Sequence, residues 1–162
     1  MSGVRIGHGF DAHRLAPGRP LLLGGVLIPF DRGLEGHSDG DVLLHAVASA
    51  LLGAMGEGDL GRHFPSSDPG LRGIASGEIL AQVAAKLAAA GFALGNLDAT
   101  VVAQEPRLGG YLAEMERTIA AALGAPVERV NVKVTSTDGL GSVGRGEGIA
   151  TAAVVLIVEE SG

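Results

Sequence analysis

The sequence predicts an α+β fold, in which a mixed β-sheet carries helices packed on one face. Segments with the apolar patterns of strands are interleaved with segments whose apolar residues recur at helical spacing. The chain has 162 residues, with no internal repeat and no linker-like stretch, which favours a single domain over residues 1–162.

The first expected elements are strands. Residues 4–8 are typical of a short strand that leads into a turn at residues 11–13. Residues 21–23 and 26–28, separated by two glycines, are typical of a hairpin.

A helix is expected next, from Ser38 to about Gly53. Ser38 is a favourable N-cap, and Asp41 follows three residues later, as in a capping box. The apolar residues that keep helical spacing in this stretch are Leu44, Val47, Ala48 and Leu51.

Residues 57–76 are rich in Gly, Pro, Ser and Asp, and are expected to form a loop of functional length. A second helix should run from Ser76 to Gly91, which supplies its C-terminal stop. Residues 97–103 then form a predicted strand, which Pro106 ends.

An apolar stripe from Leu108 to Leu123 indicates a third helix. Apolar and polar residues alternate over residues 130–135, so one face of that strand should be polar. Residues 150–158 are almost wholly apolar, as expected of a central strand.

Composition narrows the classes of function. The net charge of −6 argues against non-specific nucleic-acid binding, so an anionic ligand would need local donors. The chain has no cysteine, which excludes disulfides and thiolate metal ligands and fits a cytoplasmic location. We expect no membrane-spanning segment and no signal peptide.

Two short segments carry the residues best suited to hold a metal. Asp11 and His13 alternate along an extended segment and therefore share one face. His45 or His37 could supply a third ligand from the start of the following helix. Two imidazoles and one carboxylate leave a coordination position open, as in catalytic zinc sites, although non-haem iron uses the same donors. Taken singly, each histidine is better explained by a structural hydrogen bond, and it is the joint pattern that indicates a metal site.

Other polar clusters are suited to phosphate groups. His37 and Ser38 stand near an expected helix start, which favours anions, whereas Asp41 is better explained as a capping residue. Residues 135–138 offer three hydroxyls and a carboxylate, which suit phosphate and Mg²⁺ but also an ordinary polar strand end. The glycine-dense residues 141–148 match no Walker or Rossmann fingerprint.

Together these segments resemble the 2-C-methyl-D-erythritol 2,4-cyclodiphosphate synthase family over essentially the whole chain. The motifs that carry the resemblance are residues 5–13, 36–41 with His45, 58–61, 64–65, 68–69, 103–106 and 144–148.

The resemblance implies a role for each matching residue. Asp11, His13 and His45 would bind one Zn²⁺ per subunit, and His37 with Ser136 would steady the reacting phosphates. Asp138 would hold a second metal, Mg²⁺ or Mn²⁺, that bridges the diphosphate. The implied substrate-binding residues are Asp11, Ala12, His13, His37, Ser38, Asp59, Leu60, Gly61, Phe64, Pro65, Ser66, Ser67, Asp68, Ala103, Gln104, Glu105, Pro106, Arg107, Leu108, Gly109, Thr135, Ser136, Thr137, Asp138, Ser142 and Arg145.

The chain departs from the family pattern at a few of these positions. The family often has Glu at Asp138, Lys at Arg107, an aromatic residue at Ser142 and Asp at Ser66. The shorter Asp138 would hold the second metal through water, and the subsite around Ser142 would differ.

The implied enzyme is a phosphorus–oxygen lyase of the non-mevalonate isoprenoid pathway. It would convert 4-diphosphocytidyl-2-C-methyl-D-erythritol 2-phosphate into the 2,4-cyclodiphosphate with release of CMP. A cytoplasmic homotrimer with active sites between subunits is expected, with no nucleic-acid or membrane partner. A zinc-dependent phosphohydrolase is the alternative, and a trimeric metal-stabilised binding protein without turnover is a third possibility.

Overall fold

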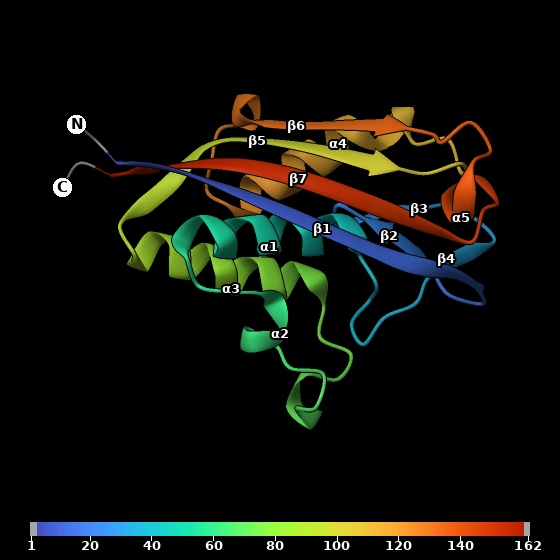
Figure 1. The fold of residues 1–162 in the computed structure, drawn as a ribbon, viewed down its shortest axis with the longest axis horizontal. Helices are drawn as coiled ribbons and strands as arrows, with labels where there is room; N and C mark the ends of the chain where they lie inside the picture. The colour runs from blue at the N-terminus through green and yellow to red at the C-terminus, as the bar shows by residue number, and fades with distance from the viewer. Residues whose placement is uncertain (1–2, 161–162) are drawn as a thin grey trace.

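The long strand β1 crosses the main sheet (Figure 1). It carries Asp11 and His13, which together with His45 are called the metal-site motif below. The computed structural model describes residues 3–160. The strands are β1 (Val4–Pro17), β2 (Leu21–Leu23), β3 (Val26–Ile28), β4 (Arg32–Leu34), β5 (Phe92–Val102), β6 (Val130–Thr135) and β7 (Gly148–Glu159). The helices are α1 (Val42–Met55), α2 (Leu60–His63), α3 (Ser76–Ala89), α4 (Leu112–Ala122) and α5 (Gly141–Gly144), with short 3₁₀ turns at Pro69–Leu71, Gly109–Tyr111 and Val127–Arg129.

The main sheet is mixed, as the sequence predicts. Its strand order is β4-β1-β7-β5-β6, and only the β5–β6 pair is parallel within it. The apolar strand β7 lies third of five, which confirms its predicted central place. The β2–β3 pair forms the predicted hairpin as a separate small sheet.

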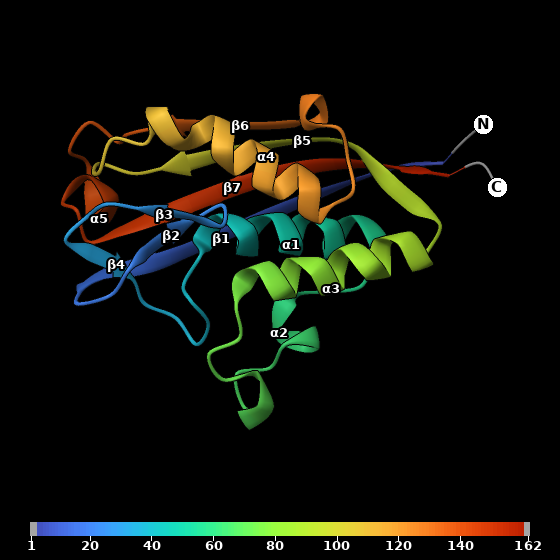
Figure 2. The ribbon, with the colours of Figure 1, turned by 180° about the vertical axis from the view of Figure 1, so that it is seen from behind.

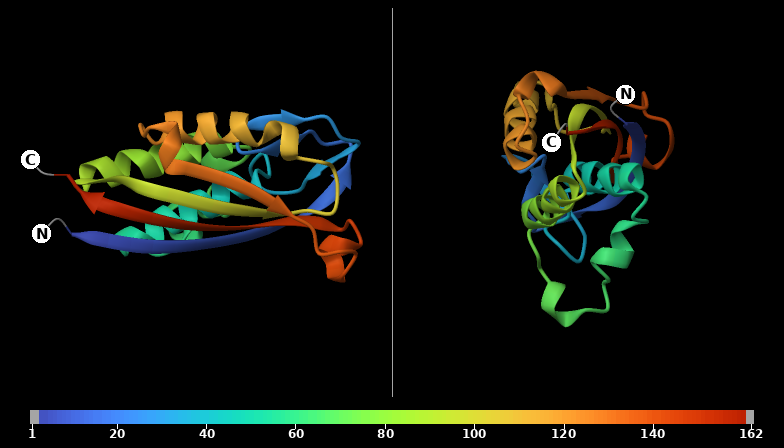
Figure 3. Two further views of the ribbon diagram at one scale, coloured as in Figure 1. Left: turned by 90° about the horizontal axis from the view of Figure 1, so that it is seen from above. Right: turned by 90° about the vertical axis from the view of Figure 1, so that its left-hand side faces the viewer.

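The long helices α1, α3 and α4 gather on one face of the sheet (Figures 2 and 3). Helix α1 packs directly on β1 because the strand presents two glycines to it. A Cβ atom on Gly7 would lie 1.9 Å from the carbonyl oxygen of Ala50, and one on Gly9 would lie 2.0 Å from that of Ala46. Only glycine permits this approach, which brings the start of α1 close to β1.

Within residues 3–160, none of the three long helices covers the other face of the sheet, which exposes apolar side chains along two strands. On β1, Ile6 is 70% exposed and Phe10 is 63% exposed, and Val154 on β7 is 46% exposed. On β6, Asn131 and Lys133 extend the same face with polar side chains that bond to Asp98 of β5, so the predicted polar strand face is confirmed.

Several predicted boundaries were wrong. The first strand does not end at residue 8 but continues to Pro17, because it pairs with β7 as far as Arg14 and then with β4. Likewise, the strand predicted at residues 97–103 already begins at Phe92. The long loop contains α2 and a 3₁₀ turn, and the glycine-dense stretch contains α5.

Ser38 is not the N-cap of the first helix. Asp41 takes that role, because its Oδ1 accepts a hydrogen bond from the backbone N–H of Leu44 at 3.0 Å. The same carboxylate accepts from the backbone N–H groups of Gly24 and Gly25, at 3.0 and 2.7 Å. Asp41 therefore ties the β2–β3 hairpin to the start of α1. No helix among residues 3–160 combines the length and apolar character needed to cross a bilayer.

Candidate active site

The metal-site motif is assembled from one strand and one helix. Asp11 and His13 lie on the helix-facing side of β1, the side that Gly7 and Gly9 share by alternation. His45 lies in the first turn of α1 and is 9% exposed. The close approach of α1 to β1 thus brings together residues that are more than thirty positions apart in the sequence.

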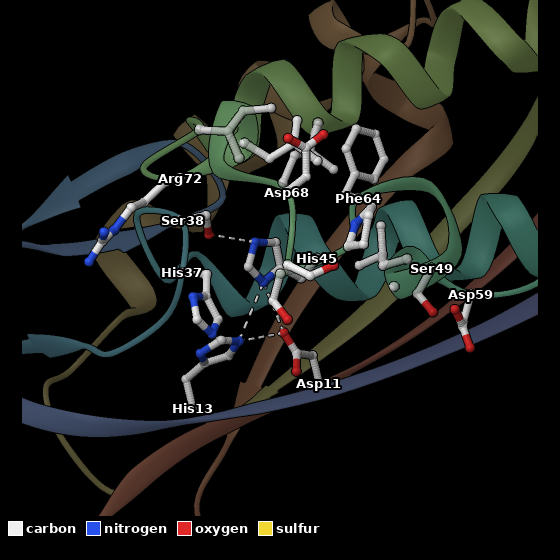
Figure 4. Close-up of a pocket in the computed structure, with 18 of the residues that line it drawn as sticks. Asp11, His13, His37, Ser38, His45, Ser49, Asp59, Phe64, Asp68 and Arg72 are labelled. Atoms are coloured by element: carbon white, nitrogen blue, oxygen red, sulfur yellow. Dashed lines mark hydrogen bonds and ion pairs between the residues drawn. The ribbon is translucent and has the colours of Figure 1, made fainter.

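The three side chains converge on one point (Figure 4). Oδ2 of Asp11 lies 2.7 Å from Nε2 of His13 and 3.0 Å from Nδ1 of His45. The two ring nitrogens are 3.4 Å apart, and one ligand atom from each residue lies within 4.8 Å of the others. The expected convergence is confirmed, with His45 rather than His37 as the third member.

A backbone carbonyl selects which nitrogen of His13 faces this point. Nδ1 of His13 contacts the carbonyl oxygen of Glu35, which can only accept a hydrogen bond. Nδ1 must therefore carry a proton, and in the neutral ring the Nε2 lone pair points toward Asp11. This is the arrangement that metal-binding histidines commonly adopt.

The site is electrostatically prepared for a cation. Burial alone would raise the pKa of Asp11, but its contacts with the rings of His13 and His45, which favour the carboxylate whenever a ring is protonated, outweigh burial and hold that pKa well below the usual range. The hydrogen bond to Asp11 in turn raises the pKa of His13. When His13 is protonated, the proton on its Nε2 lies between that nitrogen and Asp11, where a divalent cation would bind instead. The donor set fits zinc or another ion that accepts imidazole and carboxylate ligands.

The three residues open into a cavity of about 620 Å³ beneath the 57–75 segment, which projects away from the sheet (Figure 1). Among the predicted substrate-binding residues, the cavity is lined by Asp11, His13, His37, Ser38, Asp59, Leu60, Gly61, Phe64, Pro65, Ser66, Ser67 and Asp68. The segment around residues 60–71 thus lines the same cavity as the metal-site motif.

His37 and Ser38 are held at the cavity by neighbouring chain segments. The backbone N–H of Gly73 donates to the carbonyl of His37 at 2.9 Å. Oγ of Ser38 accepts from the N–H of Gly40 at 3.2 Å and lies 3.0 Å from Nε2 of His45. Ser38 therefore contacts a member of the metal-site motif, His45, and does not cap helix α1.

Two other segments of predicted substrate-binding residues, 103–109 and 135–138, lie elsewhere in the chain. They meet where the parallel strands β5 and β6 end, since the N–H of Ala103 donates to the carbonyl of Thr135 at 2.9 Å. The N–H of Gly139 donates to Oε1 of Gln104 at 3.0 Å. None of the residues 103–109 or 135–138 lines the large cavity, and the side chain of Leu108 is buried in the core.

A second cavity, of about 360 Å³, lies on another side of His13. Ala12, Ser142 and Arg145 line it, and His13 borders both cavities. Arg145 forms an ion pair with Glu147 at 2.8 Å.

Several residues in or behind the cavity are not predicted from the sequence. Ser49 lies one turn after His45 on α1, so helical spacing would have revealed it. Arg72 is the one arginine among the cavity-lining residues and brings a permanent positive charge to a cavity that three carboxylates also line. Asp39 and Ser76, which contact each other behind His45, had no sequence signal that linked them.

A helix-covered mixed sheet, with two imidazoles and a carboxylate at the edge of a large cavity, defines an α+β protein with a candidate metal centre. A model of the YgbB family matches residues 4–158. The chain belongs to this family.

Curated relatives and solved structures agree with this assignment. The chain is 55% identical to a 2-C-methyl-D-erythritol 2,4-cyclodiphosphate synthase of Desulfatibacillum aliphaticivorans, over 95% of this chain and 99% of the relative. A synthase of the same name from Geobacillus kaustophilus is 56% identical, over 94% of this chain and 97% of the relative. The family resemblance drawn from the sequence motifs is confirmed.

The fold is shared with a bifunctional IspDF from Campylobacter jejuni, with a TM-score of 0.95 and 41% identity over 99% of this chain. This chain spans 44% of that longer protein. An IspF from Plasmodium falciparum, solved as a CDP complex, has a TM-score of 0.87 and 28% identity over 99% of both chains.

Proposed function

We propose that this chain is an enzyme that converts 4-diphosphocytidyl-2-C-methyl-D-erythritol 2-phosphate into the 2,4-cyclodiphosphate and CMP. The names of its relatives support this reaction. The observation that carries it is the convergence of Asp11, His13 and His45 at the edge of a cavity large enough for a small phosphorylated ligand.

In this reaction an oxygen of the 2-phosphate attacks the β-phosphorus of the diphosphate. One P–O bond forms, the bond between the β-phosphorus and the bridging oxygen breaks, and CMP leaves with that oxygen. No protein nucleophile is required, so the protein has to position two repelling phosphates and disperse their charge.

The residues of the cavity are suited to these tasks. His37 and Ser38 would hold phosphate oxygens from the segment before α1. Asp59 and Gly61 would contact the ligand from the α2 region, and Phe64 with its neighbours would exclude water. Asp11, His13 and His45 would hold Zn²⁺, which supplies a fixed positive charge that orients and polarises a phosphate.

We further propose a homotrimer in which each active site is shared by two chains. Residues 103–109 and 135–138 would bind the cytidine diphosphate, with Ser136 on a phosphate and Asp138 on a Mg²⁺ or Mn²⁺ ion. Within one chain these residues lie outside the large cavity, which supports a second chain as their source. The uncovered apolar sheet face, with Ile6 and Phe10 exposed, is a surface suited to association. The cytoplasm stays the expected location.

Product analysis tests this function. Purified protein with Zn²⁺ and Mg²⁺ is incubated with the cytidylyl substrate, and the products are identified by ³¹P NMR. We expect CMP and the cyclic diphosphate in equal amounts, and no turnover after chelation. A linear product would indicate hydrolysis, and binding without any product would exclude catalysis.

A further inference from the structure

Behind the metal-site motif, a second group of side chains holds His45 from the side away from Asp11. Oγ of Ser76, at the start of α3, lies 2.9 Å from Nε2 of His45 and donates to Oδ1 of Asp39. The backbone N–H of Ser76 donates to Oδ2 of Asp39 at 3.0 Å. Ser76 is fully buried, so no solvent water replaces these contacts.

The direction of each hydrogen bond in the series His45–Ser76–Asp39 follows from the carboxylate of Asp39 at its end. A carboxylate has only acceptor oxygens, and Ser76 has a single hydroxyl proton, which goes to Asp39. Toward His45, the Ser76 oxygen can then only accept. Oγ of Ser38 lies 3.0 Å from the same nitrogen, so a proton on Nε2 of His45 is within reach of two hydroxyl oxygens. This arrangement leaves the lone pair of the neutral ring on Nδ1, the atom that faces Asp11 at 3.0 Å.

We propose that Ser76 and Asp39 are positioning residues that fix the ring orientation and protonation pattern of His45, so that its Nδ1 is available to a metal ion. This inference rests on the metal site of the proposed function. It assigns to the start of α3 a part in metal binding, although none of its side chains reaches the metal-facing point.

The two histidines are therefore held in different ways. A backbone carbonyl, which no substitution removes, selects the proton position of His13. For His45, the side chains of Ser76 and Asp39 favour one proton position, and each of them can be substituted separately. Asp39 is itself anchored, because its Oδ1 also accepts from the N–H of Asp41 at 3.1 Å.

The test is the zinc affinity of variants, measured by competition with a chromophoric chelator. Ser76→Ala removes the one of the two hydroxyl oxygens near Nε2 that Asp39 orients, and leaves that of Ser38. Asp39→Asn places an N–H group against a backbone N–H or the Ser76 hydroxyl in either amide orientation. We expect each to weaken zinc binding by roughly 10- to 100-fold, the range typical of residues that orient metal ligands. Ser49→Ala is the matched control, since this serine lies one turn along α1 and makes none of these hydrogen bonds; its zinc affinity should be unchanged.

A spectroscopic measurement separates positioning from a general loss of structure. In the zinc-loaded wild-type protein, ¹⁵N–¹H NMR should show the Nε2 proton of His45 protected from exchange, and Asp39→Asn should remove that protection. Wild-type protein that binds no zinc would contradict the metal site itself. Wild-type protein that binds zinc, with unchanged affinity in Asp39→Asn or no protected His45 proton, would overturn the role of Asp39 and Ser76 alone.

Discussion

His13 and His45 present different ring nitrogens to the same oxygen of Asp11, Nε2 at 2.7 Å and Nδ1 at 3.0 Å. The difference arises because one ring projects from a strand and the other from a helix that lies against it. Gly9 and Ala46 permit that contact, so the geometry of the site depends on the packing of α1 on β1. The predictions below test the site, its ligand and its assembly.

Substitutions of His45 and His37, which both line the cavity, should have different effects. His45→Ala should lose zinc and activity together, because it deletes one of three ligand atoms. His37→Ala should retain one zinc per chain and slow turnover, since it lies outside the triad. Metal content by atomic absorption and initial rates decide this, and a zinc-free His37→Ala would make His37 a ligand.

Arg72 should bind a phosphate oxygen of the substrate. It lines the cavity together with Asp11, Asp59 and Asp68, so its loss leaves the cavity without a permanent cation among its lining residues. Arg72→Gln should raise KM by about tenfold or more, the equivalent of one charge-assisted hydrogen bond, and Arg72→Lys should recover part of the loss.

Arg62→Gln is the control for Arg72→Gln, because it changes the net charge by the same amount. Arg62 belongs to the neighbouring helix α2 and does not line the cavity. Equal effects of the two substitutions on KM would show that net charge, and not contact, is responsible.

Metal affinity should fall as the solution becomes acidic. The hydrogen bond to Asp11 raises the pKa of His13 above its ordinary value, so His13 is already partly protonated near neutral pH. A metal must displace this proton, and binding therefore strengthens as pH rises through the raised pKa. Zinc titrations at pH 8 and pH 6 should differ by at least about tenfold, and a flat profile would contradict the assignment of His13 as a ligand.

Asp41 should contribute strongly to stability. Asp41→Ala leaves three backbone N–H groups without an acceptor, at the start of α1 and in the hairpin turn. Burial raises the pKa of Asp41, which offsets part of the benefit. We expect a loss of about 2–4 kcal/mol in the free energy of unfolding by urea. Asp31→Ala, which removes an exposed carboxylate, should change it by less than about 0.5 kcal/mol.

A charge on the uncovered sheet face should prevent the proposed trimer from forming. Ile6→Asp places a carboxylate in the apolar face formed by β1 and β7, and sedimentation should then show monomers. Leu27→Asp is the control, because Leu27 is 62% exposed but belongs to the separate β2–β3 hairpin.

Complementation gives an independent test of shared sites. A mixture of inactive His13→Ala and inactive Ala103→Tyr chains should recover activity once subunits exchange, because some sites then take an intact half from each chain. Exchange without recovery would contradict active sites between subunits.

Local pattern was enough to predict the three long helices, most strands and the shared face of Asp11 and His13, because apolar residues recur at helical spacing and side-chain direction alternates along any strand. It missed the short helices α2 and α5. It also identified the family, since the motifs stand in order along the chain. The start of α1 could not be chosen correctly, because Ser38 and Asp41 are both good capping residues. Contacts with Gly24 and Gly25 in the hairpin decided for Asp41.

The sequence by itself determined which residue types could hold a metal and a phosphate, because their chemistry belongs to the side chains. The choice between His37 and His45 stayed open on residue types, and the family resemblance already favoured His45. Only the tertiary structure decided that His45 meets Asp11 and His13 at one point, that Arg72 lines the cavity and that Ser76 with Asp39 contacts His45 from behind. These relationships join residues from a strand, two helices and a loop, and they depend on packing distances such as the glycine contact between β1 and α1. Spacing along the chain does not predict those distances, because they depend on how elements far apart in the sequence pack against one another.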